Sequence, residues 1–532
     1  MTDVALDSPE VRQLQNMIKD SFRVRQNDRP LYVDIGGHLA RIGAAQHQVI
    51  FGRRGSGKSC LLVHYLNESR PSDVLPVYVL ADEYKRLTYP DILIRLLIEI
   101  LEALPVRARV VRRLTGRDAA TVRLAGELRK LLDMAEESEV VEAFQQGSSE
   151  LVGAGLGRPG MASVNVGMTT DSTRGKTSTF KERKLDTLER HLRDYKAAIS
   201  DSIRSAGRRR GCLLIDDFYL IPREWHPDVL DYLHRLLRDT EMYMKVATIR
   251  HRTQLLRNHP QTVGLELSQD VEEISLDWTL EDLEATQEYL GKMLASMASR
   301  AGIPDALTRL FNADGLQELT LASGGVPRDF LNTFVTAVDA SVSERSTRWL
   351  TPKYIYKGAG RLAYQTKLRN LREDASADSA GLDRLLHDLL AFCLQEKRKT
   401  AFLVSQDEAQ RFPREHELIQ QLMDFKLIHI VEPDTSAASG RPGRYEAYTL
   451  DFSLFMEPRR RGIEIVEFWK IDENRRRTGI REAPTYSLER AGRVLEENGG
   501  LVSPEEILEG EAVRDSGDVD PSPPPVQPSL FS

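Results

Sequence analysis

The sequence predicts an α/β fold in which a parallel sheet is flanked by helices, followed by a helical lid and a smaller C-terminal domain of different design. Short apolar runs alternate with helical stretches through the first half of the chain. One of these runs leads directly into a glycine-rich turn that opens a helix. Strands joined by helical crossovers pair in parallel, and the helices then cover the faces of the sheet.

Length and composition restrict the class of protein. A chain of 532 residues is too long for one hydrophobic core. It has no apolar run of about eighteen residues, so a membrane-spanning protein is not expected. The N-terminus lacks a secretory pattern and the three cysteines are far apart, which favours a cytoplasmic protein without disulfides or zinc. A net charge of −7 means that any contact with DNA must be local.

The strand and helix pattern divides the chain into segments. Residues 1–29 contain a leading helix, over 9–26. Residues 30–279 form the sheet domain, with strands expected at 48–51, 75–80, 212–218, 243–249 and 271–276 and helices at 59–67, 89–104 and 228–239. An insertion at 105–210 interrupts this pattern. Its central part, 147–179, is rich in Gly, Ser and Thr and is expected to be flexible.

The C-terminal half follows a different pattern. Residues 280–375 read as a helical lid. Residues 376–470 show the order helix, strand, two helices and a hairpin, which is typical of a winged helix-turn-helix. Residues 414–427 take the place of the recognition helix, and Arg441 and Arg444 lie on the wing. Residues 471–532 become acidic and proline-rich, so this tail is expected to be largely disordered.

The glycine-rich turn has the pattern of a phosphate-binding loop, with a strand before it and a helix after it. Its glycines allow backbone N–H groups to turn toward phosphate oxygens, and the helix adds its positive end. We expect Lys58 to bridge the β- and γ-phosphates and Ser59 to ligate Mg²⁺. The ATP-binding stretch comprises Gly52, Arg53, Arg54, Gly55, Ser56, Gly57, Lys58, Ser59 and Cys60.

Two adjacent acids follow the apolar run at 212–215, at the carboxyl end of a strand expected in the centre of the sheet. This resembles a Walker B element. Asp216 would hold Mg²⁺ through water, and Asp217 would orient and activate the attacking water. Many relatives carry glutamate at the second position, and the shorter aspartate leaves open how fast hydrolysis is.

These motifs resemble the origin-recognition-like and STAND-related branch of AAA+ ATPases over residues 30–345. The resemblance implies a polar sensor at the end of the strand after the acids, which is Thr248 here. It also implies a lid arginine in a Gly-x-Pro-Arg motif, Arg328, that reaches the γ-phosphate. An arginine finger acting across a subunit interface is also implied, and the choice among its candidates stays open: Arg250, Arg252 and Arg257.

Two segments suggest partners. The winged-helix region occupies the place of a DNA-binding domain, but its acids and bases nearly cancel, so duplex DNA would need help from the arginine runs 459–461 and 475–477. A winged helix used for protein contact or assembly is the alternative. At the C-terminus, Gln527 to Phe531 resembles the peptide with which bacterial proteins bind the replication sliding clamp.

The sequence therefore predicts an ATP-binding and hydrolysing AAA+ switch that self-associates in its ATP state and controls assembly on DNA or with a partner protein. Replication, mobile-element and antiphage-defence contexts all remain open. The alternative is a slow or non-catalytic ATP-dependent scaffold recruited by its tail. A processive nucleic-acid motor is less favoured, because the sequence shows no further helicase motif and no strongly basic channel segment.

Overall fold

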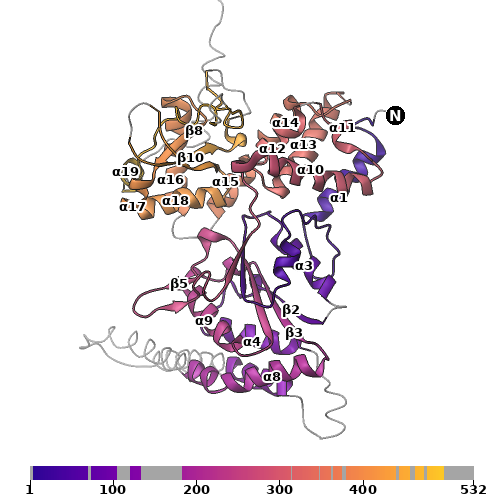
Figure 1. The fold of residues 1–532 in the computed structure, drawn as a ribbon, viewed down its shortest axis with the longest axis vertical. Coiled ribbons are helices and arrows are strands. Elements are labelled where there is room, and N and C mark those ends of the chain that lie inside the picture. Colours follow the sequence, from indigo (N-terminus) through magenta and orange to yellow (C-terminus); the bar gives the residue numbers. More distant parts are fainter. Residues whose placement is uncertain are drawn as a thin grey trace, which may run out of the picture. The chain divides into compact units, whose positions relative to one another are not determined.

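The computed structural model describes residues 4–69, 73–104, 120–133, 183–312, 314–346, 348–360, 364–373, 379–438, 442–455, 462–471 and 476–496. The chain divides into two compact units (Figure 1). The sheet unit is Arg23–Asp277, and the C-terminal unit joins Met1–Phe22 to Trp278–Ser532. No helix within the described ranges is both long and apolar enough to span a membrane. Much of the insertion, including residues 147–179, lies outside these ranges.

The sheet unit is built on a five-stranded sheet in the order β2-β3-β4-β1-β7. Every pairing in this sheet is parallel, which confirms the expected fold class. The strands are β1 (Gln48–Phe51), β2 (Val74–Leu80), β3 (Arg210–Asp216), β4 (Met242–Thr248) and β7 (Glu272–Ser275). All four residues of β1 are buried, as expected of a strand paired on both sides and covered on both faces.

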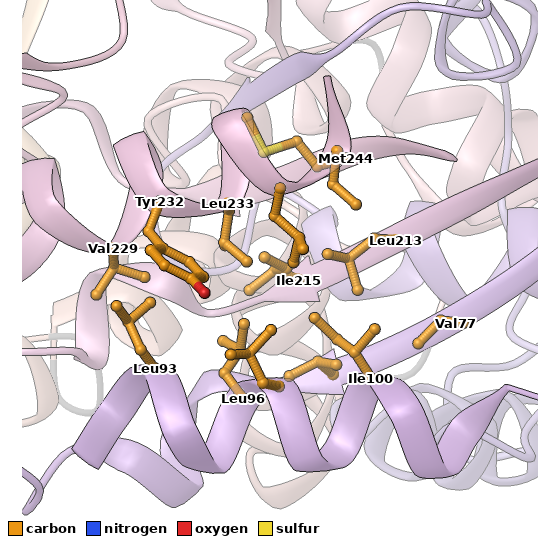
Figure 2. Packing of buried hydrophobic residues seen from close by; sticks show 14 of the residues in the cluster. Val77, Leu93, Leu96, Ile100, Leu213, Ile215, Val229, Tyr232, Leu233 and Met244 are labelled. Atoms are coloured by element: carbon orange, nitrogen blue, oxygen red, sulfur yellow. The ribbon is translucent and has the colours of Figure 1, made fainter. Parts of the chain in front are cut away.

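Helices cover both faces of this sheet. On one face pack α4 (Asp91–Ala103), α8 (Leu192–Ser205), α9 (His226–Leu237) and the helical residues 120–133. Figure 2 shows Leu96 and Ile100 of α4 on the same side of the sheet as Leu213 and Ile215 of β3. The other face carries α2 (His38–Ile42) and α3 (Lys58–Ser69). Successive strand side chains point to opposite faces, so both cores draw on the same strands.

A short antiparallel hairpin, β5 (Leu256–Arg257) and β6 (Val263–Gly264), follows β4 and was not anticipated from the sequence. Each of its strands has only two residues, which is too short for an alternating pattern to be recognised. Leu255, directly before it, packs against the larger core. The hairpin is therefore attached to the sheet unit by tertiary packing.

The C-terminal unit combines the N-terminal helix α1 with the lid helices, which come from the middle of the chain. The leading helix α1 (Pro9–Ser21) is shorter than expected and packs against the lid helices α10 and α13. Gln15 donates to the Val335 carbonyl at 3.2 Å and to Asp339 at 2.8 Å. The lid helices are α10 (Leu283–Arg300), α11 (Ala306–Leu310), α12 (Gly315–Ala322), α13 (Pro327–Ser343), α14 (Pro352–Gly358) and α15 (Tyr364–Glu373).

The C-terminal module follows the expected order of helix, strand, two helices and hairpin. Its elements are α16 (Ser379–Leu390), a π-helical turn (Ala391–Glu396), β8 (Ala401–Ser405), α17 (Gln406–Arg411), α18 (Pro413–Asp424), β9 (Ile428–Thr435) and β10 (Tyr445–Leu450). The three strands form an antiparallel sheet in the order β8-β10-β9. The helix α18 lies where the recognition helix was expected, at residues 414–427, and its role stays a prediction.

The structure corrects the expectation that the chain is largely disordered from residue 471. Residues 476–496 are folded on the module and include a helix, α19 (Leu488–Glu496). Tyr486 is fully buried and donates to Asp388 at 2.7 Å, and Arg490 pairs with the same carboxylate at 2.7 Å. Composition suggested disorder, but this segment buries apolar side chains against the module. The peptide Gln527 to Phe531 lies outside the described residues.

Candidate nucleotide-binding site

The register of the sheet brings three of the expected site segments to one edge. Phe51, the last residue of β1, lies opposite Thr248, the last residue of β4. Ile215 of β3 lies opposite Val246 of β4. Asp216, the next residue, therefore lies beside the carboxyl end of β4. The loop after β1, the acids of β3 and the end of β4 therefore share the carboxyl edge, where ligands of open parallel sheets bind.

The loop after β1 depends on its glycines. Gly55 and Gly57 have φ values of 92° and 101°, which residues other than glycine rarely adopt. At Gly52, a Cβ atom would lie 2.3 Å from the Ser56 Oγ atom, so the loop closes only around a glycine there. The helix α3 begins at Lys58, immediately after the loop, and its positive N-terminal end therefore faces the loop.

The polar groups of this loop fit a phosphate group. Lys58 is buried, and its Nζ atom donates to the backbone oxygens of Gly52 and Arg53 at 2.7 and 3.2 Å. The Ser56 hydroxyl is buried and has no hydrogen-bond partner within the described part of the chain. A buried hydroxyl without a hydrogen-bond partner is costly, and a phosphate oxygen would accept a hydrogen bond from it. This orphaned donor beside Lys58 makes the loop suited to an anion.

The other loop residues differ in their contacts. The backbone N–H of Arg53 donates to Asp277 at 2.8 Å, and its Nε atom lies 3.3 Å from the same carboxylate. Arg54 is exposed, and Ser59 is half-buried in the first turn of α3. The Cys60 thiol donates to the Leu31 carbonyl at 3.4 Å, and burial raises its pKa to about 12. This thiol therefore remains neutral.

Asp216 is held by two hydrogen bonds, one on each carboxylate oxygen. The Tyr78 hydroxyl donates to Oδ2 at 2.8 Å, and the Asp217 backbone N–H donates to Oδ1 at 3.0 Å. Only 1% of Asp216 is exposed. Burial and then the adjacent Asp216 carboxylate raise the pKa of Tyr78 well above its usual value, so its phenol stays a donor. Asp217 has left-handed backbone angles, with φ 53° and ψ 37°, and begins the turn after the strand.

Thr248 lies fully buried between the loop and the segment after β4. Its carbonyl accepts the Gly52 N–H at 3.2 Å, and its hydroxyl shares a hydrogen bond of 2.5 Å with Thr253. A phosphate loop on one strand and an acidic pair on another are thus separated by a strand that ends in a polar residue. The fold is a parallel α/β sheet flanked by helices, of the AAA+ type.

The three arginines after β4 all have contacts within the sheet unit. Arg250 pairs with Glu273 and lies 4.3 Å from the centre of the Phe51 ring. Arg252 lies 5.0 Å from the centre of the Tyr219 ring. Arg257 makes two hydrogen bonds of 2.9 Å to Asp228, so its guanidinium is held against α9. None of them is singled out as an arginine finger.

Arg328 belongs to the C-terminal unit, near the start of α13. Gly324 and Gly325 before it have φ values of 58° and 77° and turn the chain into this helix. Its guanidinium donates to the Phe22 carbonyl at 2.9 Å. The expected contact between Arg328 and a γ-phosphate stays a prediction.

Sequence reasoning missed Tyr78 and Asp277. Tyr78 lies opposite Leu214 in the β2–β3 register, and Asp216 follows Leu214 by two residues, so both point to the same face. That alternation was a usable signal once the two strands were taken as neighbours. Asp277 follows β7 and had no motif to mark it.

Comparison with known proteins adds resemblance at the level of general fold. No family model and no curated protein matches the chain. Among solved structures, Drosophila ORC bound to DNA is 10% identical, covering 84% of this chain and 90% of that chain with a TM-score of 0.34. The Orc1 protein of Aeropyrum pernix in complex with DNA is 15% identical, covering 83% and 88%, with a TM-score of 0.32. A Walker-type ATPase of Pyrococcus abyssi is 13% identical, covering 81% and 97%, with a TM-score of 0.40.

These likenesses concern the fold alone. The superpositions are too loose to carry residue roles, so the assignment of each site residue depends on the geometry of this chain.

Proposed function

We propose that this chain is an AAA+ switch that binds ATP with Mg²⁺, hydrolyses it, and uses the nucleotide state to control assembly on DNA or with a partner protein. The observation that carries the proposal is the phosphate-suited loop, with its orphaned Ser56 hydroxyl, in register with Asp216 and Thr248. A phosphate-binding loop and an acidic pair at one sheet edge are the two parts that nucleotide hydrolysis requires.

Each residue has a distinct role in this proposal. Lys58 leaves the backbone oxygens that it now contacts and binds the β- and γ-phosphates. Ser59 and Asp216 would hold Mg²⁺, which would neutralise charge on the phosphates. Asp217 orients and deprotonates the attacking water, and the Thr248 hydroxyl keeps that water in place. Arg328 carries the state of the γ-phosphate to the lid.

A slow ATP-dependent scaffold is the second candidate, and Asp217 is the observation that favours it. Its side chain is one methylene shorter than glutamate, and its left-handed backbone sets the direction in which that short chain can reach. A base that falls short of the water leaves binding intact and removes turnover. ATP would then remain bound without being hydrolysed and would stabilise one arrangement of the protein.

The C-terminal module, which we interpret as a winged helix, would provide the contact surface. Several of its basic groups are already paired: Arg444 with Asp434, and Arg477 with the Glu281 carbonyl. On α18, His416 lies 2.7 Å from Glu446. Arg441, the run 459–461 and Arg475 lie outside the described residues. Such pairing favours a protein partner as much as DNA, since DNA affinity depends on basic groups available to phosphates.

The experiment is to measure ATP binding and phosphate release for the wild type and Lys58→Ala, with and without duplex DNA, and to follow oligomer size in parallel. We expect wild-type turnover that Lys58→Ala abolishes and an ATP-dependent increase in oligomer size. Stimulation by DNA would favour assembly on DNA, whereas binding without turnover would favour the scaffold. Absence of ATP binding by the wild type would refute the assignment.

A further inference from the structure

Asp216 is the proposed metal-holding acid, and its orientation depends on a side chain from a neighbouring strand. One of its oxygens accepts a backbone N–H from Asp217, which any residue at that position would supply except proline. The other accepts a hydrogen bond from the hydroxyl of Tyr78 at 2.8 Å, and of these two bonds it is the one that depends on a particular side chain. We propose that Tyr78 is a positioning residue that orients the Asp216 carboxylate for the nucleotide-bound Mg²⁺.

The strand register explains why this tyrosine reaches the acid. β2 and β3 run in parallel, with Tyr78 opposite Leu214 and Leu80 opposite Asp216. Tyr78 thus starts one pleat before Asp216 on the same face, and its long side chain extends along the strand direction to the carboxylate. A shorter side chain from the same position would not reach it.

The ring of Tyr78 is held on the face of the sheet that also carries α3. It packs against the smaller core, which includes Leu61 and Leu62 of this helix. The helix α3 begins with Lys58 and Ser59, the proposed ligands of phosphate and metal. One side chain therefore packs against the core to which α3 contributes and bonds the acid on β3. Its position restrains Asp216 relative to that helix.

This restraint affects metal binding in particular. A carboxylate that binds Mg²⁺, directly or through water, must present one lone pair in a set direction, because Mg²⁺ requires near-octahedral geometry. Hydrogen bonds from outer groups set that direction, and loss of such a partner typically lowers metal affinity or activity by about 10- to 100-fold. The loop groups that we propose to contact the phosphates take no part in the hydrogen bond between Tyr78 and Asp216.

The inference rests on the proposed function, and Tyr78→Phe tests it because it removes only the hydroxyl. Binding of fluorescent N-methylanthraniloyl-ATP to the full chain would be measured in EDTA and then over a Mg²⁺ titration. We expect Tyr78→Phe to keep the wild-type affinity in EDTA and to need at least about tenfold more Mg²⁺ for half-saturation. Turnover should fall at low Mg²⁺ and recover at high Mg²⁺.

The matched control is Tyr65→Phe. Tyr65 belongs to α3 and packs in the same core, and its hydroxyl bonds the Cys212 thiol. We expect this variant to keep the wild-type Mg²⁺ titration. A double-mutant cycle with Asp216→Asn gives a second measurement, in which the effect of Tyr78→Phe on the titration should disappear.

The outcomes separate the two proposals. If wild-type nucleotide affinity rises with Mg²⁺ and Tyr78→Phe gives the same titration, Tyr78 does not position the acid. The inference also fails if Tyr65→Phe shifts the titration equally, or if the shift persists beside Asp216→Asn. If the wild type binds no nucleotide at all, the proposed function fails and this inference fails with it.

Discussion

A buried ionic network in the C-terminal unit provides the sharpest test of the structure. Asp451, at the end of β10, is fully buried and lies 2.7 Å from both Lys367 Nζ and His429 Nε2. Lys367 is also buried, with 4% of its side chain exposed, and comes from the lid helix α15. The network therefore joins the lid to the module. Asp451→Asn removes the negative charge and keeps the shape of the side chain.

The expected loss of stability in Asp451→Asn follows from the burial of Asp451 and Lys367. At 2.7 Å and an effective dielectric constant of about 20, the attraction between Asp451 and Lys367 is about 6 kcal/mol. Part of this offsets the desolvation of both charges. Measured losses on removing one member of a buried pair are about 3–5 kcal/mol, since the other charge stays buried without compensation. We expect Asp451→Asn to destabilise the C-terminal unit by that amount.

The matched control is an exposed pair in the same module. Lys399 lies 3.1 Å from Glu464, with 22% and 59% of the two side chains exposed. Because water screens this pair, Lys399→Gln should cost less than about 1 kcal/mol. The contrast between the two variants isolates burial as the cause.

The difference in stability between the wild type and Asp451→Asn should also depend on pH. Burial alone would raise the pKa of Asp451, but the positive charge of Lys367 and the hydrogen bond from His429 outweigh it and lower the pKa. A carboxyl whose folded pKa is depressed stabilises the fold above its unfolded pKa, about 4, and loses this contribution as the pH falls. The stability gap between wild type and Asp451→Asn should therefore narrow below about pH 4.

Tryptophan fluorescence can report this unit alone. Of the four tryptophans, Trp225 lies in the sheet unit and the others, Trp278, Trp349 and Trp469, lie in the C-terminal unit. Urea denaturation in a Trp225→Phe background would follow only the unit that contains the network. If Asp451→Asn shifts the transition no more than Lys399→Gln does, the buried charge pair does not exist as described.

Two further predictions address turnover and packing. Asp217→Asn should lower phosphate release by roughly 100-fold with ATP affinity unchanged; equal release by both forms would instead support the scaffold. Gly324→Ala should lower the melting temperature strongly, because its Cβ would lie 2.0 Å from the His429 ring and φ is +58°. The control is Gly207→Ala, where φ is +68° but nothing lies within 4 Å of a Cβ, so this change should lower the free energy of unfolding by only about 1–2 kcal/mol. Equal losses of stability at both sites would contradict the packing at His429.

The phosphate loop and its strand were predictable because their signals are local. The strand at 48–51 has the same bounds in the structure as in the sequence analysis. The glycines that the loop requires are recognisable from their spacing, since only glycine readily takes these backbone angles. The acid-bearing strand was placed slightly late, and it ends at Asp216, because Asp217 adopts a left-handed conformation that begins the turn.

What the sequence did not predict depends on contacts between distant segments. The helix α19 lies in a polar stretch, and its position depends on Arg490 reaching Asp388 and Glu396 of α16 and the turn that follows. The hydrogen bond of Tyr78 to Asp216 requires knowledge that β2 and β3 are neighbours. Composition and periodicity describe each segment alone, so such pairings cannot be derived from them.

Two contacts beside residues that we propose to sense the nucleotide bear on the proposed switch. In the phosphate loop, Arg53 is bonded to Asp277, which directly precedes the C-terminal unit. In that unit Asp329, the residue after Arg328, lies 2.8 Å from Lys426 at the end of α18. Under the proposed function, a displacement of Arg53 would reach Asp277, and a displacement of Arg328 would reach the module through Asp329 and Lys426. Because closely packed groups transmit displacement, we expect a displacement of α13 in the lid to be shared by the module.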